Sequence, residues 1–245
     1  VQAFDAQTLE TLGRDHSPED AAQSVRDLRE AGFANLNIDL MFAIPGQTLD
    51  SWHESLERVC DLGTEHVSAY NLTYEEDTEF LRKFENGQWS QDSDRDAEFF
   101  LAADEILTKS GFEHYEVSNY AKPGFRSAHN QAYWAGADYL GLGPSAVSTR
   151  GTERWKNVAD TARYVEMVEQ LGHARAEAES LTDEQRNLER LALALRTEAG
   201  VELDLLAQDS GEPLVADGLA IKTGDRLRLT LEGMMVADEI AGFLA

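Results

Sequence analysis

The chain has 245 residues, 42% of them hydrophobic, and a formal net charge of −25. This length and apolar content suffice for one large domain, or a large and a small one, and they exclude wholesale disorder. A surface with 21 Lys and Arg against 46 Asp and Glu repels phosphate backbones, so we expect no general nucleic-acid binding. The acidity fits solubility or a salty interior and indicates no substrate.

The cellular compartment is indicated by features that the sequence lacks. It has no apolar run of about eighteen residues and no secretory type of leader, so we expect no transmembrane segment. Its single cysteine, Cys60, excludes an intramolecular disulfide and a multi-cysteine iron–sulfur site within these residues. A reducing, cytoplasmic location is expected. Because the chain begins at Val1 rather than Met, we expect it to be a fragment of a longer polypeptide.

Helix and strand signals alternate through the first half of the chain. Ser17 followed by Pro18 is typical of a helix start, and Gly32 of its end. Further along, the sequence predicts strands over residues 36–42 and 66–72, and helices over residues 48–62 and 94–110. This alternation predicts an α/β fold with right-handed crossovers.

The second half begins with residues 115–120, which alternate like an exposed edge strand, and it contains a polar stretch at residues 172–180 that resembles a hinge. A capping box at Thr182 opens a helix, residues 226–233 indicate a strand and turn, and residues 235–244 a last helix. Helices with a small hairpin favour a winged-helix module. It carries too few cations for DNA binding to be favoured.

Polar residues near strand ends are candidates for chemistry, because α/β folds place their sites there. Asp39 and Asn71 are such residues. An aspartate within an apolar strand is costly unless it is paired, so Asp39 predicts a hydrogen-bonding partner, a cap or a ligand.

The densest group of candidate binding residues is His-Asn-Gln-Ala-Tyr-Trp at residues 129–134, which we expect in a loop before the glycine-rich residues 141–146. Haem iron takes axial His, and a porphyrin needs flat apolar walls, which fits His129, Tyr133 and Trp134. The alternative is a structural His with ordinary aromatic packing.

Several segments in one order cover essentially the whole chain. They are VQAFD at residues 1–5, LGRDHS at residues 12–17, IDLMFAIPGQT at residues 38–48, HVSAYNL at residues 66–72, HNQAYW at residues 129–134 and LTLEG at residues 229–233. On these segments the chain resembles the radical S-adenosylmethionine (SAM) oxygen-independent coproporphyrinogen III oxidase-like family. The HNxxYW segment resembles the haem chaperone branch of that family.

The resemblance implies three domains within an α/β architecture. Residues 1–112 would be the C-terminal part of a radical SAM partial (β/α) barrel. Residues 113–175 would be an accessory segment with the HNxxYW motif, and residues 176–245 a winged-helix-like domain.

The resemblance also implies a binding site for S-adenosyl-L-methionine lined by Gln2, Arg14 and Asp39. Arg14 suits the methionine carboxylate, and Asp39 suits a ribose hydroxyl or the amino group, with Gln2 on nearby polar atoms. The alternatives are a surface salt bridge for Arg14 and strand-end capping for the other two.

For haem, the resemblance implies His129 as the iron ligand, with Tyr133 and Trp134 as walls. Relatives often carry His near the end of the glycine-rich segment, where this chain has Val147. A second nitrogen ligand must then come from elsewhere, or the iron is five-coordinate. The cysteines of the family's 4Fe–4S cluster would lie upstream, in a full-length parent only, and we expect Cys60 to be a buried core thiol.

Three hypotheses follow. The first is a haem chaperone that delivers haem to acceptor proteins, among them membrane-associated respiratory proteins. The second is an oxygen-independent coproporphyrinogen III oxidase (dehydrogenase) of porphyrin biosynthesis, which the acidity mildly disfavours; without cluster cysteines this chain should not be catalytic alone. The third is a truncated remnant that exposes strand edges.

Overall fold

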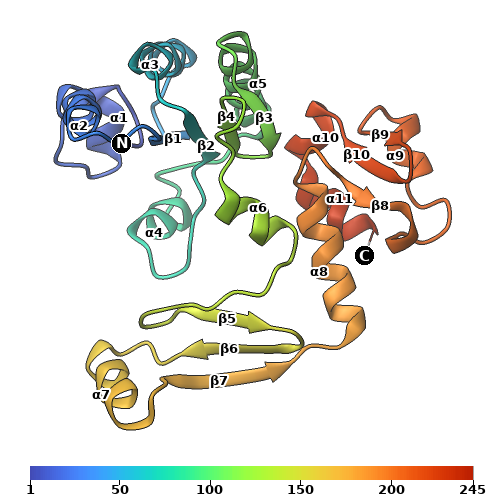
Figure 1. The fold of residues 1–245 in the computed structure, drawn as a ribbon. Coiled ribbons are helices and arrows are strands. Elements are labelled where there is room, and N and C mark those ends of the chain that lie inside the picture. Colours follow the sequence, from blue (N-terminus) through green and yellow to red (C-terminus); the bar gives the residue numbers. More distant parts are fainter. Residues whose placement is uncertain (245) are drawn as a thin grey trace. The chain divides into compact units, whose positions relative to one another are not determined.

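The computed structural model describes residues 1–244, and the chain divides into two compact units, Val1–Ser127 and Ala128–Ala245. Helices and strands alternate in the first unit (Figure 1). Its elements are α1 (Ala6–Thr11), α2 (Pro18–Glu30), β1 (Asn37–Phe42), α3 (Leu49–Leu62), β2 (His66–Asn71), α4 (Glu79–Glu85), α5 (Ser93–Lys109), β3 (Glu113–Glu116) and β4 (Asn119–Ala121). The three helices and two strands that the alternating pattern predicts are all present, as α2, α3, α5, β1 and β2.

The sheet of the first unit is mixed and open, with the strand order β1-β2-β4-β3. β1 and β2 are parallel, whereas β4 runs antiparallel to both β2 and β3. Gln2 lies beside β1 through a parallel bridge to Leu40, so the first residues of the chain extend the sheet on that side. The described strands do not close into a barrel.

The prediction of one exposed edge strand over residues 115–120 is wrong. These residues form the β3–β4 hairpin, in which Tyr115 and Tyr120 are buried and β4 is an inner strand. The apparent alternation came from two short strands joined by a tight turn. Helix α4 was not anticipated either, because its seven residues give too short a periodic signal.

One face of the sheet packs under α3 and α5. Ile38, Leu40 and Phe42 alternate onto this face, as the two-residue period of a strand requires. Trp52 of α3 is fully buried between Phe42 and Phe99, with ring centroids 5.6 Å and 6.4 Å away, respectively. Its indole N–H donates to the Phe99 carbonyl at 2.9 Å, so the one polar group of this large core side chain has a hydrogen-bond partner.

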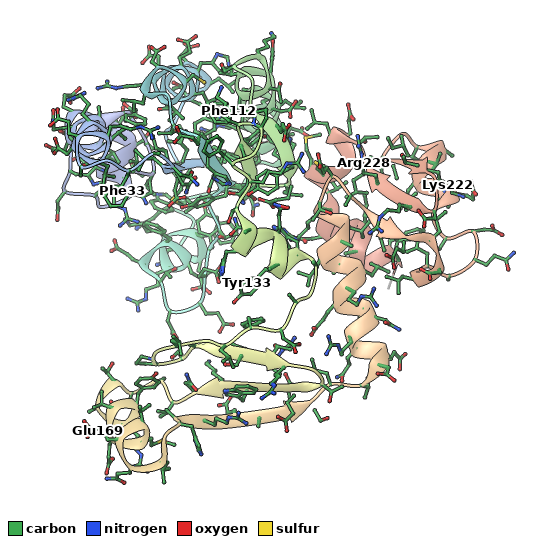
Figure 2. All side chains as sticks on the ribbon, in the orientation of Figure 1. Phe33, Phe112, Tyr133, Glu169, Lys222 and Arg228 are labelled. Atoms are coloured by element: carbon green, nitrogen blue, oxygen red, sulfur yellow. The ribbon has the colours of Figure 1, made fainter. Side chains whose placement is uncertain are left out.

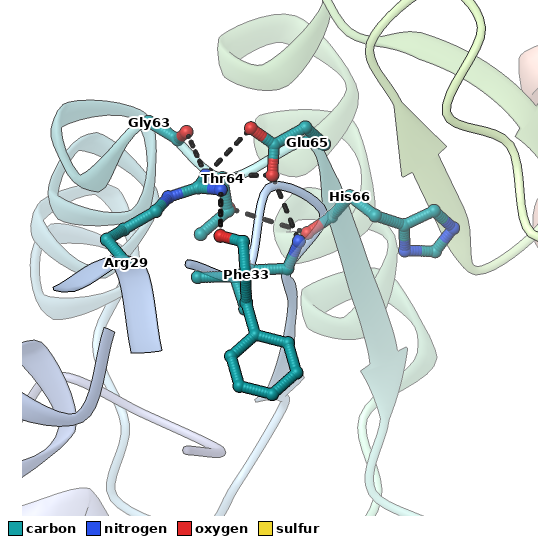
Figure 3. A network of polar contacts seen from close by, with 7 residues as sticks. Arg29, Phe33, Gly63, Thr64, Glu65 and His66 are labelled. Atoms are coloured by element: carbon teal, nitrogen blue, oxygen red, sulfur yellow. Dashed lines mark hydrogen bonds and ion pairs between the residues drawn. The ribbon is translucent and has the colours of Figure 1, made fainter. Parts of the chain in front are cut away.

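A charged clamp joins the end of α2 to the start of β2 (Figure 3). Arg29 Nη2 lies 2.7 Å and 2.8 Å from the two carboxylate oxygens of Glu65 and also donates to the Gly63 carbonyl at 2.9 Å. The same carboxylate accepts from the Leu36 N–H at 3.0 Å, just before β1. The clamp therefore fixes where the two parallel strands begin.

The second unit contains two three-stranded antiparallel sheets, with orders β5-β6-β7 and β8-β10-β9. Its elements are α6 (Ala128–Trp134), β5 (Val147–Arg150), β6 (Glu153–Asn157), α7 (Thr161–Leu171), β7 (Arg175–Ser180), α8 (Asp183–Leu195), β8 (Val201–Glu202), η1 (Leu203–Leu205), α9 (Glu212–Ala216), β9 (Ala220–Thr223), β10 (Arg226–Leu229), α10 (Leu231–Met235) and α11 (Ala237–Leu244).

Two expectations for this unit need correction, and one is confirmed. The stretch at residues 172–180 is not a hinge, because most of it is β7, which pairs with β6. The expected last helix is two helices, α10 and α11, separated at Val236. The capping box at Thr182 is present and opens α8. No described helix is long and apolar enough to cross a membrane.

An ion pair ties α8 to the β5-β6-β7 sheet. Arg154 of β6 donates to both carboxylate oxygens of Glu189 on α8, at 2.6 Å and 2.7 Å. A two-point contact of this kind fixes orientation as well as distance. It sets the position of α8 beside β6, where a pocket of the second unit is found.

Candidate functional site

The sheet of the first unit carries polar side chains on the face opposite its core. Asn37 pairs in register with His66, and Asp39 with Ser68. Because alternate residues of a strand share a face, these four side chains lie on one surface. This arrangement explains why β1 has polar residues inside an apolar run.

A chain of side-chain hydrogen bonds crosses this polar face. His66 lies 2.6 Å from the Asn37 side-chain oxygen through Nδ1, and 2.7 Å from the Tyr115 hydroxyl through Nε2. Asn37 in turn donates to the Asp39 carboxylate at 2.7 Å. The expectation of a hydrogen-bonding partner for Asp39 is therefore confirmed.

The placement of Asp39 near a strand end is wrong, because it is the third of the six residues of β1. Asn71 does end β2, and its amide donates to the Asp96 carboxylate at 2.9 Å. Burial lowers the pKa of His66, and the negative charge of Asp39 opposes that shift. The central His of this face is consequently held towards its neutral form.

The three residues implied to bind S-adenosyl-L-methionine come from separate segments. Gln2 donates its backbone N–H to the Asp39 carbonyl at 2.8 Å and has a left-handed φ of 69°, which is uncommon for a residue with a side chain. Arg14 is exposed in the loop after α1 and lines an open cavity of about 390 Å³ with Asp15 and His16.

Arg14 and Asp39 both act on Tyr70 of β2. Burial raises the pKa of Tyr70, the charge of Asp39 raises it further, and the charge of Arg14 lowers it. Opposite charges therefore lie within electrostatic reach of one phenol. A pair of opposite charges is the chemistry needed for a ligand with both a carboxylate and an amino group.

The HNxxYW motif lies on a helix, α6, and not in the expected loop. Ala128, Gln131 and Ala132 favour helix, and Gly136 with a φ of +67° follows its end. His129 and Tyr133 are exposed, and their ring centroids lie 5.0 Å apart. Tyr133 projects from α6 (Figure 2) and also contacts Tyr139, with centroids 4.5 Å apart.

Trp134 has a different neighbour. The guanidinium carbon of Arg196, just after α8, lies 5.9 Å from the Trp134 ring centroid. Its indole nitrogen is buried and has no hydrogen-bond partner among the described residues. A buried donor without a hydrogen-bond partner is uncommon in proteins. The indole N–H of Trp134 is such a donor, on the helix that carries the motif.

The glycine-rich segment after the motif is held by backbone contacts. A Cβ atom at Gly141 would lie 2.2 Å from the Val147 carbonyl oxygen, so no other residue fits there without a shift. The Asn157 side-chain amide donates to the Gly141 and Gly143 carbonyls at 3.2 Å and 3.0 Å. Val147 begins β5 and is 37% exposed.

Sequence reasoning missed a pocket of about 280 Å³ in the second unit. Its walls include Tyr133 and Tyr139, Arg154 of β6, and Arg186 and Arg190 of α8, so they come from segments that lie far apart in the sequence. No local pattern indicated it, because the pocket depends on how α8 packs. The spacing of Arg186 and Arg190, one helical turn apart, was its only signal.

Metal ligation by clustered side chains is not found in the described part of the chain, where no group of three His, Cys, Asp or Glu residues could hold an ion. Cys60 lies on α3 and is half-buried, so the expectation of a buried core thiol is wrong. The described residues therefore do not fit an iron–sulfur cluster.

Among solved structures, the chain is similar to coproporphyrinogen III oxidase (HemN) from Escherichia coli, described as a radical SAM enzyme. The TM-score is 0.80 at 22% identity, over 100% of this chain and 62% of that one. At this identity the likeness concerns the fold alone, and it defines a mixed α/β protein whose fold matches part of the HemN chain.

Curated relatives define the family. The chain is 31% identical to the haem chaperone HemW of Bacillus subtilis, over 99% of this chain and 67% of that protein. It is 34% identical to HemW of Mycobacterium tuberculosis strain H37Rv, over 98% of this chain and 63% of the relative. The chain belongs to the HemW and radical SAM coproporphyrinogen oxidase-like family.

The chain spans about half to two thirds of the length of the curated relatives it matches. No family model matches it.

Proposed function

We propose that this chain is part of a haem-binding chaperone that passes haem to acceptor proteins. The observation that carries the proposal is the exposed His129 on α6, one helical turn before Tyr133. A haem handed from protein to protein needs a ligand that is reachable from solvent and an aromatic surface beside it. Both are present on a single face of α6.

In this proposal haem is the cargo, and His129 ligates its iron. Tyr133 offers a ring face next to that His, and Trp134 belongs to the same helix. Residue 147, where a second nitrogen ligand was expected, is Val, and in this proposal the iron keeps an open sixth position. An open position favours transfer, because an incoming ligand of the acceptor can bind before His129 leaves. The acceptors would be proteins that take up haem, including membrane-associated respiratory proteins.

We also propose that Gln2, Arg14 and Asp39 bind S-adenosyl-L-methionine. The opposite charges that act on Tyr70 support this assignment. When bound, the cofactor can supply a sulfonium group and, where an electron source exists, a radical. The residues of this chain would orient it: Arg14 on the carboxylate, and Asp39 on the amino group or a ribose hydroxyl.

The finer architecture is also part of the proposal. Residues 1–112 would be the C-terminal part of a partial barrel, which the parallel β1–β2 pair and the likeness to HemN support. Residues 113–175 would be an accessory segment, and residues 176–245 a winged-helix-like domain, supported by the β8-β10-β9 sheet between helices. We expect the whole protein to work in the cytoplasm.

A hemin titration of the full-length protein tests the haem proposal. The starting protein should give a shifted Soret band, and His129→Ala should lose the shift or bind at least about tenfold more weakly, the loss expected for one coordinate bond. His173→Ala is the matched control, because His173 is an exposed His of the same unit outside the motif. Equal binding by the His129 variant would contradict the assignment.

A second assay separates the chaperone from the oxidase. The reduced, reconstituted full-length protein is given coproporphyrinogen III and S-adenosyl-L-methionine. We expect no protoporphyrinogen, and turnover would favour the oxygen-independent coproporphyrinogen III oxidase.

A further inference from the structure

The pocket of the second unit is lined by the end of α6 and the segment that follows it, by β5 and β6, and by α8. One side is formed by Tyr133, Tyr139 and Ala137, and the other by Leu193, Arg186 and Arg190. Its volume of about 280 Å³ is near the lower end of ligand-binding pockets. It is large enough for one edge of a flat ligand and too small for a whole macrocycle.

The charge of the pocket opposes that of the chain. Three arginines and one glutamate, Glu189, line it, in a protein with a net charge of −25. Glu189 is paired with Arg154, which also donates to the Thr149 hydroxyl at 3.1 Å. The carboxylate of Glu189 therefore serves mainly to neutralise Arg154, and the positive charge left over belongs to α8.

The two arginines of α8 are the ones available to bind a ligand. The guanidinium of Arg186 makes no hydrogen bond or ion pair with the part of the chain that the structure describes, residues 1–244; Arg186 and Glu189 interact only electrostatically. Arg190 makes one long ion pair, 3.7 Å from its Nη2 to Glu202, and Glu202 is also bound at 3.1 Å by Arg226. Two guanidinium groups one helical turn apart can each bind a carboxylate.

The pocket is connected to the HNxxYW motif through Tyr133. That ring contacts both His129 and Tyr139, and both tyrosines line the pocket. Aromatic side chains in such a row form a surface on which a conjugated ring can stack. A ligand seated on it would turn one ring face towards His129 and place one edge in the pocket.

We propose that this pocket binds the carboxylate-bearing edge of a tetrapyrrole, with Arg186 and Arg190 as the partners of its two propionate groups. The inference rests on the proposed haem function and adds to it the site that binds the ligand's carboxylates. Tyr133 and Tyr139 bind the ring edge, and Leu193 and Ala137 exclude water from it. The pocket would therefore distinguish a free porphyrin acid from its ester.

Metal-free protoporphyrin IX and its dimethyl ester are the probes, because neither contains iron and so neither depends on His129. Binding to the full-length protein is followed by porphyrin fluorescence. Arg186→Gln and Arg190→Gln should each weaken binding of the free acid by about tenfold, as expected for loss of one charge-assisted contact at a half-exposed site. Arg228→Gln on β10 removes the same charge from an exposed site of the same unit and should change nothing (Figure 2).

The dimethyl ester should bind the starting protein and both α8 variants equally, and more weakly than the free acid. If the variants bind the free acid as tightly as the starting protein, or if the ester binds as tightly as the acid, the pocket proposal is overturned. If protoporphyrin depends on the two arginines while hemin shows no shift that depends on His129, the pocket stands and the haem chaperone assignment fails. Circular dichroism of each variant confirms that it is folded.

Discussion

His129 and Tyr133 lie one turn apart on α6, and their ring centroids are 5.0 Å apart at an interplanar angle of 58°. Residues four apart on a helix share a face, so this contact follows from the helix itself. It places an imidazole and a phenol ring on one surface. The same phenol ring stands 4.5 Å from that of Tyr139, which extends the surface towards the pocket.

The ring of Tyr133, and not its hydroxyl, should determine hemin binding. Tyr133→Phe keeps the ring and should change the hemin affinity by less than about twofold, whereas Tyr133→Ala should weaken it about threefold to tenfold, the value of one aromatic contact. The measurement is a hemin titration read at the Soret band. Equal losses in both variants would point to the hydroxyl, and no loss in either would remove Tyr133 from the site.

Two helical glycines should respond in opposite directions to the same substitution. A Cβ atom at Gly233 of α10 would lie 2.0 Å from the Leu219 carbonyl oxygen, whereas one at Gly242 of α11 would meet no atom within 4 Å. Gly233→Ala should therefore destabilise the second unit by about 3 kcal/mol through overpacking. Gly242→Ala should stabilise it by up to about 1 kcal/mol through helix propensity.

Urea denaturation followed by circular dichroism measures both glycine variants. The two substitutions remove the same backbone freedom from the unfolded chain, so a difference between them reports on the folded state. A Gly233 variant as stable as the starting protein would mean that α10 packs less closely against Leu219 than the structure describes.

Stability should fall as His66 gains a proton. Because burial lowers the pKa of His66 below its ordinary 6.5, the folded state resists protonation more than the unfolded state does. Its contribution to stability is full above pH 6.5 and is lost as the pH falls through the lower pKa of the folded state. His66→Gln should remove this part of the pH dependence, seen by urea denaturation between pH 7.5 and 5. His53→Gln, at an exposed position of α3, should leave it unchanged.

Glu65 should contribute to stability in a more acidic pH range than His66 does. Burial acts to raise the pKa of Glu65, but the hydrogen bonds from Arg29 and from the Leu36 N–H outweigh it and hold the pKa below the ordinary 4.5. The stabilisation is present above pH 4.5 and is lost as the pH falls through the folded-state pKa. Arg29→Gln should cost about 1 kcal/mol at pH 7, since the pair is largely shielded from water.

The matched control for the Glu65 prediction is Lys109→Gln, which breaks an exposed pair with Glu105 on one helix. It should have little effect on the free energy of unfolding, because solvent screens that pair. If the Arg29 and Lys109 variants lose equal stability, the clamp at the start of β2 adds nothing beyond an ordinary surface ion pair.

The sequence by itself determined the elements whose signals are local. Ser17 and Thr48 cap α2 and α3, and Thr182 caps α8, because a capping hydrogen bond needs only residues three apart. The apolar run of β1 and the order of the family motifs were also readable, and relatives confirm the family. Residues 115–120 and α6 were misread, because their patterns are too short to distinguish a hairpin from a strand or a helix from a loop.

Only the tertiary structure decided which distant side chains meet. Asp39 and its partner Asn37 share one face of β1, but the link onward to His66 and Tyr115 depends on strand register. Likewise, Tyr133, Arg186 and Arg190 line one pocket only once α8 has packed against the rest of the second unit, where Glu189 pairs with Arg154. Such contacts arise from long-range packing, which no local sequence pattern encodes.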